Sequence, residues 1–372
     1  MMAKANPIND THKAGPMAVF FLTQTMQIAI EFVFIQQLVT KDSQQDAWIA
    51  VLLGGLSTFP VMWLILRLLE KERRYGQADL FSIQRRIFGK LIGSMLNLIV
   101  SIYVFLYSVT YLRSLIELLQ VEIFPQLSTL VFSVLFCLIV WYIVMGGFRN
   151  IVGVSLINFI YLLPLFLSNV FVVPHAHFSN LLPIMEHRPQ QIFLSFFMNT
   201  HVYVGFEFIL FYYPFIKKPE EAKKWAYFSL LTTLYIYLIF IILGIVYYSQ
   251  GEVQKTIWPT LTFWKSIKFP FFEHVDIIFS IILLWSLIPL VSLCSWVLTR
   301  GIKFTFPKIK KKYSLIAILI LTIVTAYLIR DGQQVMMLTR LFNIIGFIAI
   351  YCYIPLLFLC QWLKNLFTGE TA

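Results

Sequence analysis

The chain has 372 residues, of which 59% are hydrophobic and 13% charged, and its formal net charge is +11 at pH 7. A soluble domain carries about 25% charged residues, so this composition excludes an ordinary soluble protein and predicts one built for a lipid bilayer. The basic residues stand in short clusters between apolar stretches, which argues against a nucleic-acid partner and favours contact with lipid headgroups at the inner face of a membrane.

Apolar stretches long enough to cross a bilayer, about 20 residues each, recur along the chain and predict an all-α polytopic membrane protein. We expect ten spans, near residues 15–39, 46–69, 93–118, 127–146, 149–173, 191–216, 225–249, 274–299, 314–329 and 335–363. The loop 256–272 is apolar and aromatic with two lysines, and we expect it to lie along the membrane interface. The spans form one transmembrane domain, 15–363, between a polar segment, 1–14, and a short tail, 364–372.

The distribution of Lys and Arg predicts the orientation of these spans. With ten spans, the loops on the side of the two termini hold the densest basic clusters, at 67–90, 217–224 and 300–312. Loops rich in Lys and Arg remain in the cytoplasm, so both termini are expected there. The first apolar run is too long for the core of a cleaved signal peptide, and we expect it to stay in the membrane.

The first span is interrupted by polar residues at the depth of the lipid tails. Its middle contains Gln24, Thr25, Gln27 and Glu31. A charge at the centre of a bilayer costs roughly 2.5 kcal/mol or more, so such groups persist where they face a cavity lined by protein. We therefore predict that these four residues line a ligand-binding site.

The sixth span repeats this interruption with Asn199, Thr200, Gly205 and Glu207. Matching polar or glycine interruptions in two halves of a membrane protein indicate an inverted-repeat fold, with its binding site near the middle of the membrane. We predict two repeats of five spans, about 15–173 and 191–363, with interrupted helices one and six. The alternative is that these amides and hydroxyls only hydrogen-bond neighbouring helices.

Spans three and eight offer further candidates for the site. Tyr103, Tyr107 and Tyr111 are spaced by four and form one stripe on a helix face, which is either packing or pocket lining. One turn further on, Arg113 and Glu117 are spaced for an ion pair.

In span eight, Pro289 frees a backbone carbonyl near Ser292. This proline either only kinks the helix or helps to place Ser292 in the pocket.

Catalytic and metal-binding patterns are missing from the sequence. There is no GxSxG or phosphate-binding loop, the four cysteines lack CxxC spacing, and the six histidines form no HExxH motif. We expect neither an enzyme nor a cofactor or metal site.

Several short segments, spread over almost the whole length, carry a resemblance to a known family when they are taken together. They are 7–10 leading into 25–28, 45–49, 205–207 followed by 213–217, 257–260, and the acidic pair Glu273 and Asp276. In these segments the chain resembles the B subunits of bacterial spore germinant receptors, which belong to the amino acid–polyamine–organocation superfamily.

The resemblance implies a LeuT-like fold and a receptor subunit of the spore inner membrane. It implies two partners, an A subunit and a lipoprotein C subunit, and a small nutrient ligand such as an amino acid, whose binding triggers germination. By the same analogy, the site uses the broken first span, Tyr103 and Tyr107, the residues around Gly205, and span eight. A different function for the same fold is an ion-coupled carrier of amino acids or amines, and a third is a membrane scaffold with a vestigial site.

One feature departs from the family pattern. The unwound part of the first span usually contains glycine, but here no glycine lies between Gly15 and Gly54. Unwinding is expected to be harder without glycine, and Glu31 in the pocket would repel a ligand carboxylate. We therefore expect an altered specificity, either for a ligand with an extra cationic group or for one that is not a free amino acid.

Overall fold

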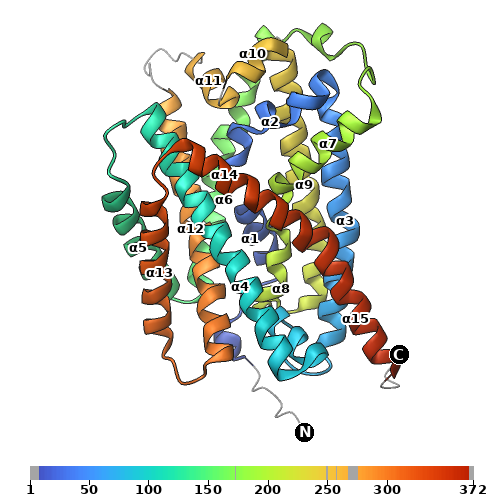
Figure 1. Cartoon of the computed structure of the whole chain (residues 1–372), viewed down its shortest axis with the longest axis vertical. Helices are drawn as coiled ribbons and strands as arrows, with labels where there is room; N and C mark the ends of the chain where they lie inside the picture. Colours follow the sequence, from blue (N-terminus) through green and yellow to red (C-terminus); the bar gives the residue numbers. More distant parts are fainter. Residues whose placement is uncertain (1–7, 172, 249, 257, 267–274, 368–372) are drawn as a thin grey trace.

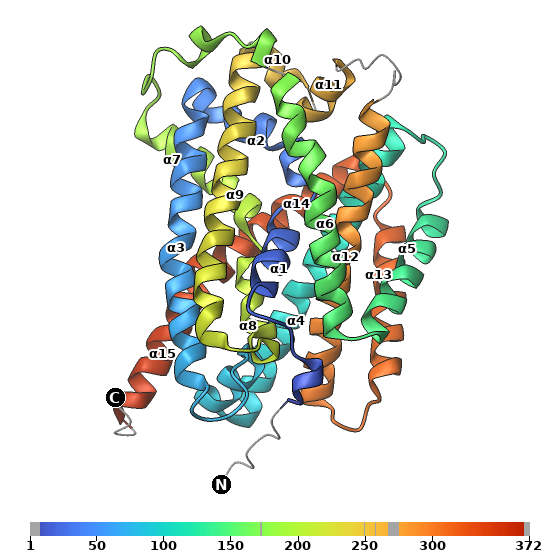
Figure 2. The same cartoon turned by 180° about the vertical axis from the view of Figure 1, so that it is seen from behind.

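The computed structural model describes residues 8–171, 173–248, 250–256, 258–266 and 275–367. Throughout this part the chain is helical without a β-strand, and its one isolated β-bridge joins Ala14 to Ile216. The helices stand side by side as a bundle, with both termini at the same end (Figures 1 and 2). We call this the terminal end and the opposite one the far end.

Each predicted span falls on helical segments. The α-helices are α1 Ala18–Gln27, α2 Ile35–Ser43, α3 Ala47–Glu72, α4 Leu80–Glu122, α5 Thr129–Met145, α6 Phe148–Leu167, α7 Pro189–Asn199, α8 Ile209–Tyr212, α9 Pro219–Tyr247, α10 Gln250–Lys255, α11 Pro259–Ser266, α12 Val275–Thr305, α13 Lys311–Leu328, α14 Gly332–Phe347 and α15 Ile354–Phe367. Within the described residues, seven helical runs are long and apolar enough to cross a membrane, and α5 is a shorter apolar helix. The all-α membrane class is therefore confirmed, while the count of ten spans and the repeat stay predictions.

The first span is broken although it contains no glycine after Gly15 at its start. Helix α1 ends at Gln27, Ile28 is extended, and a 3-10 turn at Glu31–Val33 leads into α2. Hydroxyl groups from other helices satisfy the freed backbone carbonyls: Tyr107 donates to that of Met26, Tyr237 to that of Gln27 at 2.6 Å, and Thr260 to that of Phe32 at 2.8 Å. This explains how the chain can unwind here with side chains that disfavour it, because a freed carbonyl is costly only without a donor.

The sixth span is broken opposite the first. After α7 the chain passes through a 3-10 turn, Thr200–Tyr203, and reaches Gly205 with φ of +120°. Two further 3-10 turns flank the short helix α8. A Cβ atom on Gly205 would lie 2.7 Å from the carbonyl oxygen of Met26, so the two breaks touch backbone to backbone and require glycine here.

The remaining helices hold this pair of breaks in place. Helix α12 packs on α4, α5, α6 and α13, and α9 packs on α1 and α3. Helices α14 and α15, joined by a π-helical turn at Ile348–Tyr353, run obliquely across one face of the bundle (Figure 1).

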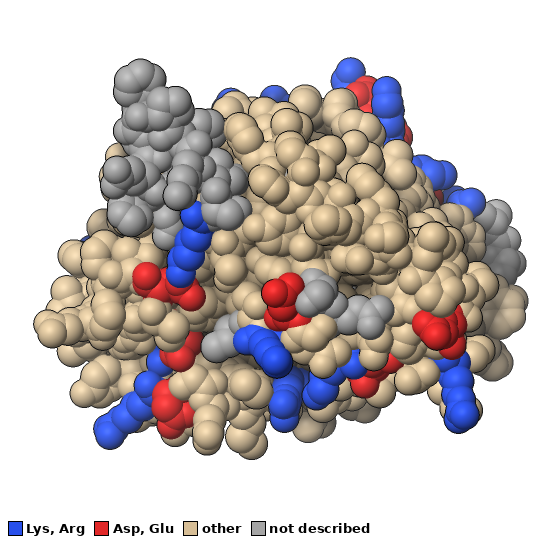
Figure 3. Space-filling model, turned by 90° about the horizontal axis from the view of Figure 1, so that it is seen from above, with Lys and Arg blue, Asp and Glu red and all other residues tan. Residues whose placement is uncertain are grey.

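Short helices cover the far end. The described part of 256–272 contains α11, whose eight residues cannot cross a bilayer and which packs on α2, α9 and α12. Its Trp264 is fully buried and donates to the hydroxyl of Ser168 at 3.0 Å. Seen from this end, acidic and basic side chains are interspersed among uncharged ones (Figure 3). Helix α11 therefore forms part of a cap over the far end of the bundle.

A buried carboxylate anchors the long far-end loop to the start of α3. Asp46 accepts hydrogen bonds from the backbone N–H of Met185 at 2.7 Å and of His187 at 3.0 Å, and its Oδ2 lies 3.1 Å from His187 Nδ1. The segment 45–49, one of those that carry the family resemblance, therefore has a structural role.

Replacing Asp46 by asparagine is expected to lower the free energy of unfolding by about 1–3 kcal/mol, because one buried acceptor is lost and its partners stay behind. The thermal unfolding midpoint of the protein in detergent measures this effect. Asp42→Asn, the same change at a half-buried position of α2, is the matched control. Equal midpoints for the two variants would show that Asp46 is not an anchor.

Candidate functional site

Some of the predicted site residues come together where the two broken spans meet α4, a place that we call the junction: Tyr103 contacts Glu207, and Tyr107 contacts the backbone of Met26. Among those whose side chains are described, all are buried: Gln24, Thr25, Gln27, Glu31, Tyr103, Tyr107, Thr200, Glu207 and Ser292. The backbone of Gly205 is buried with them. The side chain of Asn199 lies outside the described residues, as do those of Glu273 and Asp276.

Glu207 is held by one group from α4 and one from its own break. The hydroxyl of Tyr103 donates to Oε1 at 2.6 Å, and the backbone N–H of Gly205 donates to Oε2 at 2.7 Å. Both carboxylate oxygens therefore have a donor, and the pair fixes the sixth span to the third.

The tyrosine stripe of α4 lines the junction. Tyr107 donates to the carbonyl of Met26, and its ring stacks on that of Tyr111 with the centroids 4.6 Å apart and the planes 4° from parallel. Phe342 of α14 lies edge-on to Tyr107 and Tyr111. Tyr111, which lies beside Glu31, thus belongs with the predicted pair.

Glu31 is a buried acid that pairs with no basic side chain among the described residues. It sits in the 3-10 turn after the first break, where the hydroxyl of Tyr111 and the backbone amides of residues 29–31 surround its carboxyl group. Its Oε2 atom has no hydrogen-bond partner. A polar atom left in this way is costly, which marks Glu31 as the strongest candidate for contact with a ligand.

The two glutamines of α1 bind neighbouring elements. Gln24 donates to the backbone carbonyl of Ser229 at 2.8 Å, and Gln27 donates to that of Tyr203 at 2.7 Å. The Gln24 Oε1 and Thr25 Oγ1 atoms nevertheless remain buried without partners. The Nε2 group of each glutamine therefore serves helix packing, as the alternative interpretation expected.

Thr200 and Ser292 bond within their own chain segments. Thr200 donates to the carbonyl of Phe196 at 3.2 Å, and Ser292 donates to that of Ile288 at 2.7 Å, each one turn earlier. Pro289 lies inside the continuous helix α12, and the pairing of Ser292 within that helix agrees with a role in shaping it. The predicted pair Arg113 and Glu117 is present at 3.1 Å, and Arg113 also donates to the carbonyl of Ile329 at 2.7 Å.

A cavity lies on each side of the junction, toward the two ends of the bundle. The far-end cavity, about 460 Å³, is bounded by α2, α4, α10 and α14, and its lining includes Ile30, Ser114 and Glu117. The terminal-end cavity, also about 460 Å³, is lined by residues of α4, α12 and α13 and by Phe215.

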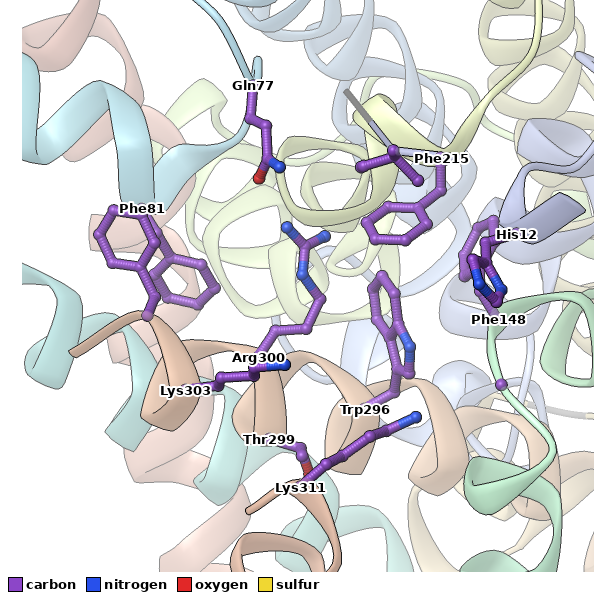
Figure 4. A pocket seen from close by; sticks show the side chains of 13 residues that line it. His12, Gln77, Phe81, Phe148, Phe215, Trp296, Thr299, Arg300, Lys303 and Lys311 are labelled. Carbon is purple, nitrogen blue, oxygen red and sulfur yellow. The ribbon is translucent and has the colours of Figure 1, made fainter. Parts of the chain in front are cut away.

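Arg300 dominates the terminal-end cavity. Its guanidinium group donates to Asp79 at 2.7 Å and to the carbonyl of Phe211 at 3.0 Å, with the rings of Phe215 and Trp296 beside it (Figure 4). This one side chain ties α12 to the start of α4 and to α8, and it closes the terminal side of the junction.

Arg300→Lys is expected to loosen this closure, because an ammonium group cannot make both hydrogen bonds and the ring contact together. Cys294, fully buried two turns earlier on α12, is a natural reporter once the other three cysteines are replaced by serine. Its rate of labelling by a maleimide should rise about tenfold if the closure loses about 1.4 kcal/mol. The exposed Arg330→Lys is the control, and an unchanged rate would show that Arg300 does not close this side.

Several residues of the junction were missed at the sequence level. Tyr237, Thr233 and Ser229 of α9, and Thr260 of α11, all bond the first span. Nothing in the sequence around these four residues distinguishes them from other polar residues in apolar helices. Only the packing of distant segments brings them to the first span.

Comparisons with known proteins agree with this architecture. The sequence model of the family described as "Spore germination protein" matches residues 14–335. Spore germination protein GerQB of Bacillus cereus is 33% identical over 355 residues, which cover 95% of this chain and 97% of that protein.

Two solved structures share the fold. MhsT in complex with L-phenylalanine has a TM-score of 0.58 at 12% identity, covering 94% of this chain and 88% of MhsT. Mhp1, a nucleobase-cation-symport-1 family transporter with bromovinylhydantoin bound, has a TM-score of 0.58 at 16% identity, covering 89% of this chain and 76% of Mhp1. The expected LeuT-like fold is thus confirmed, and by its sequence the chain belongs to the spore germination protein family.

Proposed function

We propose that this chain is the B subunit of a nutrient germinant receptor, in which a small molecule binds between the two broken spans and triggers germination. The observation that carries the proposal is the junction itself. Two unwound segments touch at Gly205 and Met26, and the buried acids Glu31 and Glu207 flank the contact. Such polar backbone is tolerated inside a membrane protein where it lines a site.

Membership of the spore germination protein family supports a role for this site in sensing. The proposed partners are an A subunit and a lipoprotein C subunit, and the proposed location is the spore inner membrane. Both termini lie at the end that also carries the basic clusters 67–90, 217–224 and 300–312, which supports a cytoplasmic location for that end. Membrane lipid is then the environment of the exposed apolar helix faces.

The alternative is an ion-coupled transporter of amino acids or amines, and the fold shared with MhsT and Mhp1 favours it as the second candidate. Two measurements separate the functions. Deletion of the gene should abolish the response of spores to at least one nutrient, and purified protein in liposomes should not accumulate that nutrient under a sodium or proton gradient. Gradient-driven uptake together with unaltered spores would contradict the receptor proposal.

The partners can be tested in the same strain. Cross-linking of spore membranes followed by purification of this chain should recover an A-type and a lipoprotein C-type subunit. Recovery of this chain without either one would argue against the proposed complex.

A further inference from the structure

The hydrogen-bond donors at the two breaks are already used by the chain's own groups. The N–H of Gly205 and the hydroxyl of Tyr103 hold Glu207. The amides of residues 29–31 and the hydroxyl of Tyr111 surround the carboxyl group of Glu31. Unwound helix ends bind anions through such donors. The donors at Gly205 and Tyr103 are therefore used by Glu207, and those near residues 29–31 lie beside the carboxyl group of Glu31, so a ligand carboxylate at either break would have to compete with an internal acid.

The atoms that remain free at the first break can accept hydrogen bonds. Glu31 Oε2, Gln24 Oε1 and Thr25 Oγ1 are buried without a partner. Among the described residues, no Lys, Arg or His forms an ion pair with the carboxyl group of either Glu31 or Glu207. The nearest arginine in sequence to Tyr111 is Arg113, whose guanidinium group is taken up by Glu117 and the carbonyls of Ile329 and Arg330.

Glu31 and Glu207 are buried acids that form no ion pair with a described basic side chain. A buried carboxyl group without such a partner is kept neutral by protonation or is stabilised by a cation. A cationic ligand at Glu31 would therefore supply the partner that the described residues lack, whereas a further carboxylate would be repelled by either acid once it is ionised.

The far-end cavity lies beside the residues that flank this position. Ile30, which lines the cavity, precedes the buried Glu31 in the chain, and Ser114, also in the lining, follows Tyr111 by three residues on α4. The far end is therefore the side from which a ligand would approach Glu31. On the other side, Arg300 closes the approach.

Resting on the proposed function, we propose that the ligand is a cation without a carboxylate group, whose positive charge pairs with Glu31 Oε2. The shared chemistry is that of an ammonium group, supplied by an organic amine, or of a monovalent metal ion. Because Glu207 already accepts from the N–H of Gly205 and the hydroxyl of Tyr103, the carboxylate of a free amino acid has no free donor there, and amino acids bind weakly.

The test uses the full chain purified in detergent and thermal stabilisation as the signal for binding. The probes are matched pairs, the amino acids alanine, leucine and phenylalanine against the amide of each, with sodium and potassium chloride as separate arms. At least one amide, or one of the two metal ions, should stabilise the protein at a concentration roughly tenfold or more below that of any of the amino acids, since a charge-assisted contact contributes about that factor or more. Stabilisation by an amide identifies an organic amine as the ligand, and stabilisation by potassium or sodium alone identifies the metal ion.

Two variants locate the effect. Glu31→Gln should remove the stabilisation, whereas Glu220→Gln, the same change at the exposed start of α9, should keep it. Because the preference for amides or ions is measured on the unaltered protein, the test does not depend on the folding of a variant. Binding of the amino acids as tightly as their amides, no stabilisation by any amide or metal ion, or stabilisation that survives Glu31→Gln would each overturn the proposal.

The outcome is separable from that of the proposed function. If deletion of the gene abolishes a nutrient response while the protein prefers amino acids, the receptor function stands and the class of ligand is wrong. If spores without the gene keep every response, the receptor function fails whatever the probes show.

Discussion

Replacing Gly205 by alanine is expected to remove the protein from the spore membrane and with it the nutrient response. A residue with a side chain held at φ of +120° costs of order 1–3 kcal/mol in backbone strain. In addition, the new Cβ would lie 2.7 Å from the Met26 carbonyl oxygen, so one of the two breaks must move. Because Gly205 also donates to Glu207, such a movement disturbs the acid as well.

Gly153→Ala is the matched control for this variant. Gly153 lies in helix α6 with open space where its Cβ would be, and alanine should stabilise a helix there by roughly 0.5–1 kcal/mol. The measurements are the amount of this chain in spore membranes and the extent of germination. Normal amounts and a normal response in Gly205→Ala spores would contradict the close contact of the two breaks.

Tyr103→Phe is expected to destabilise the protein by about 1.5–3 kcal/mol, because it leaves a buried carboxylate oxygen of Glu207 without its donor. Glu207→Gln removes the negative charge of the acceptor, so the hydrogen bond from the Tyr103 hydroxyl then contributes less to stability. The double variant should therefore lose less stability than the two single changes added together, with a coupling of about 0.5–3 kcal/mol.

Thermal or denaturant unfolding of the four proteins in detergent measures this coupling. Tyr248→Phe is the control partner for Glu207→Gln, since the Tyr248 hydroxyl donates to the Pro259 carbonyl at the far end. Its effect should add to that of Glu207→Gln without coupling. Strict additivity for Tyr103 and Glu207 would show that their contact contributes nothing to the junction.

The position of the site could be predicted from the sequence because polar groups inside apolar spans have few tolerable environments. Gln24 to Glu31 and Thr200 to Glu207 marked the two breaks, and the spacing of Tyr103 and Tyr107 marked the face of α4 that meets them. The helices could also be located, because the length of an apolar stretch and the basic clusters beside it are read from residues that are neighbours in the sequence.

The support of the first break could not be predicted in this way. Local reasoning expected the absence of glycine to hinder unwinding, yet hydroxyls from Tyr107, Tyr237 and Thr260 satisfy the freed carbonyls. These donors stand on three helices far along the chain, and their meeting depends on tertiary packing. For the same reason, the anchoring role of Asp46 and the use of Gln27 in packing required the structure.

The dose–response of spores that carry Glu207→Gln in the complete receptor tests the central claim most directly. The control strain carries Glu220→Gln, the same change at the exposed start of α9, and both strains must contain equal amounts of the protein. If the junction of the two broken spans is the ligand site, the nutrient concentration for half-maximal germination should shift by roughly tenfold or more in the Glu207→Gln strain. A curve that coincides with that of the control would contradict the claim that this junction recognises the nutrient.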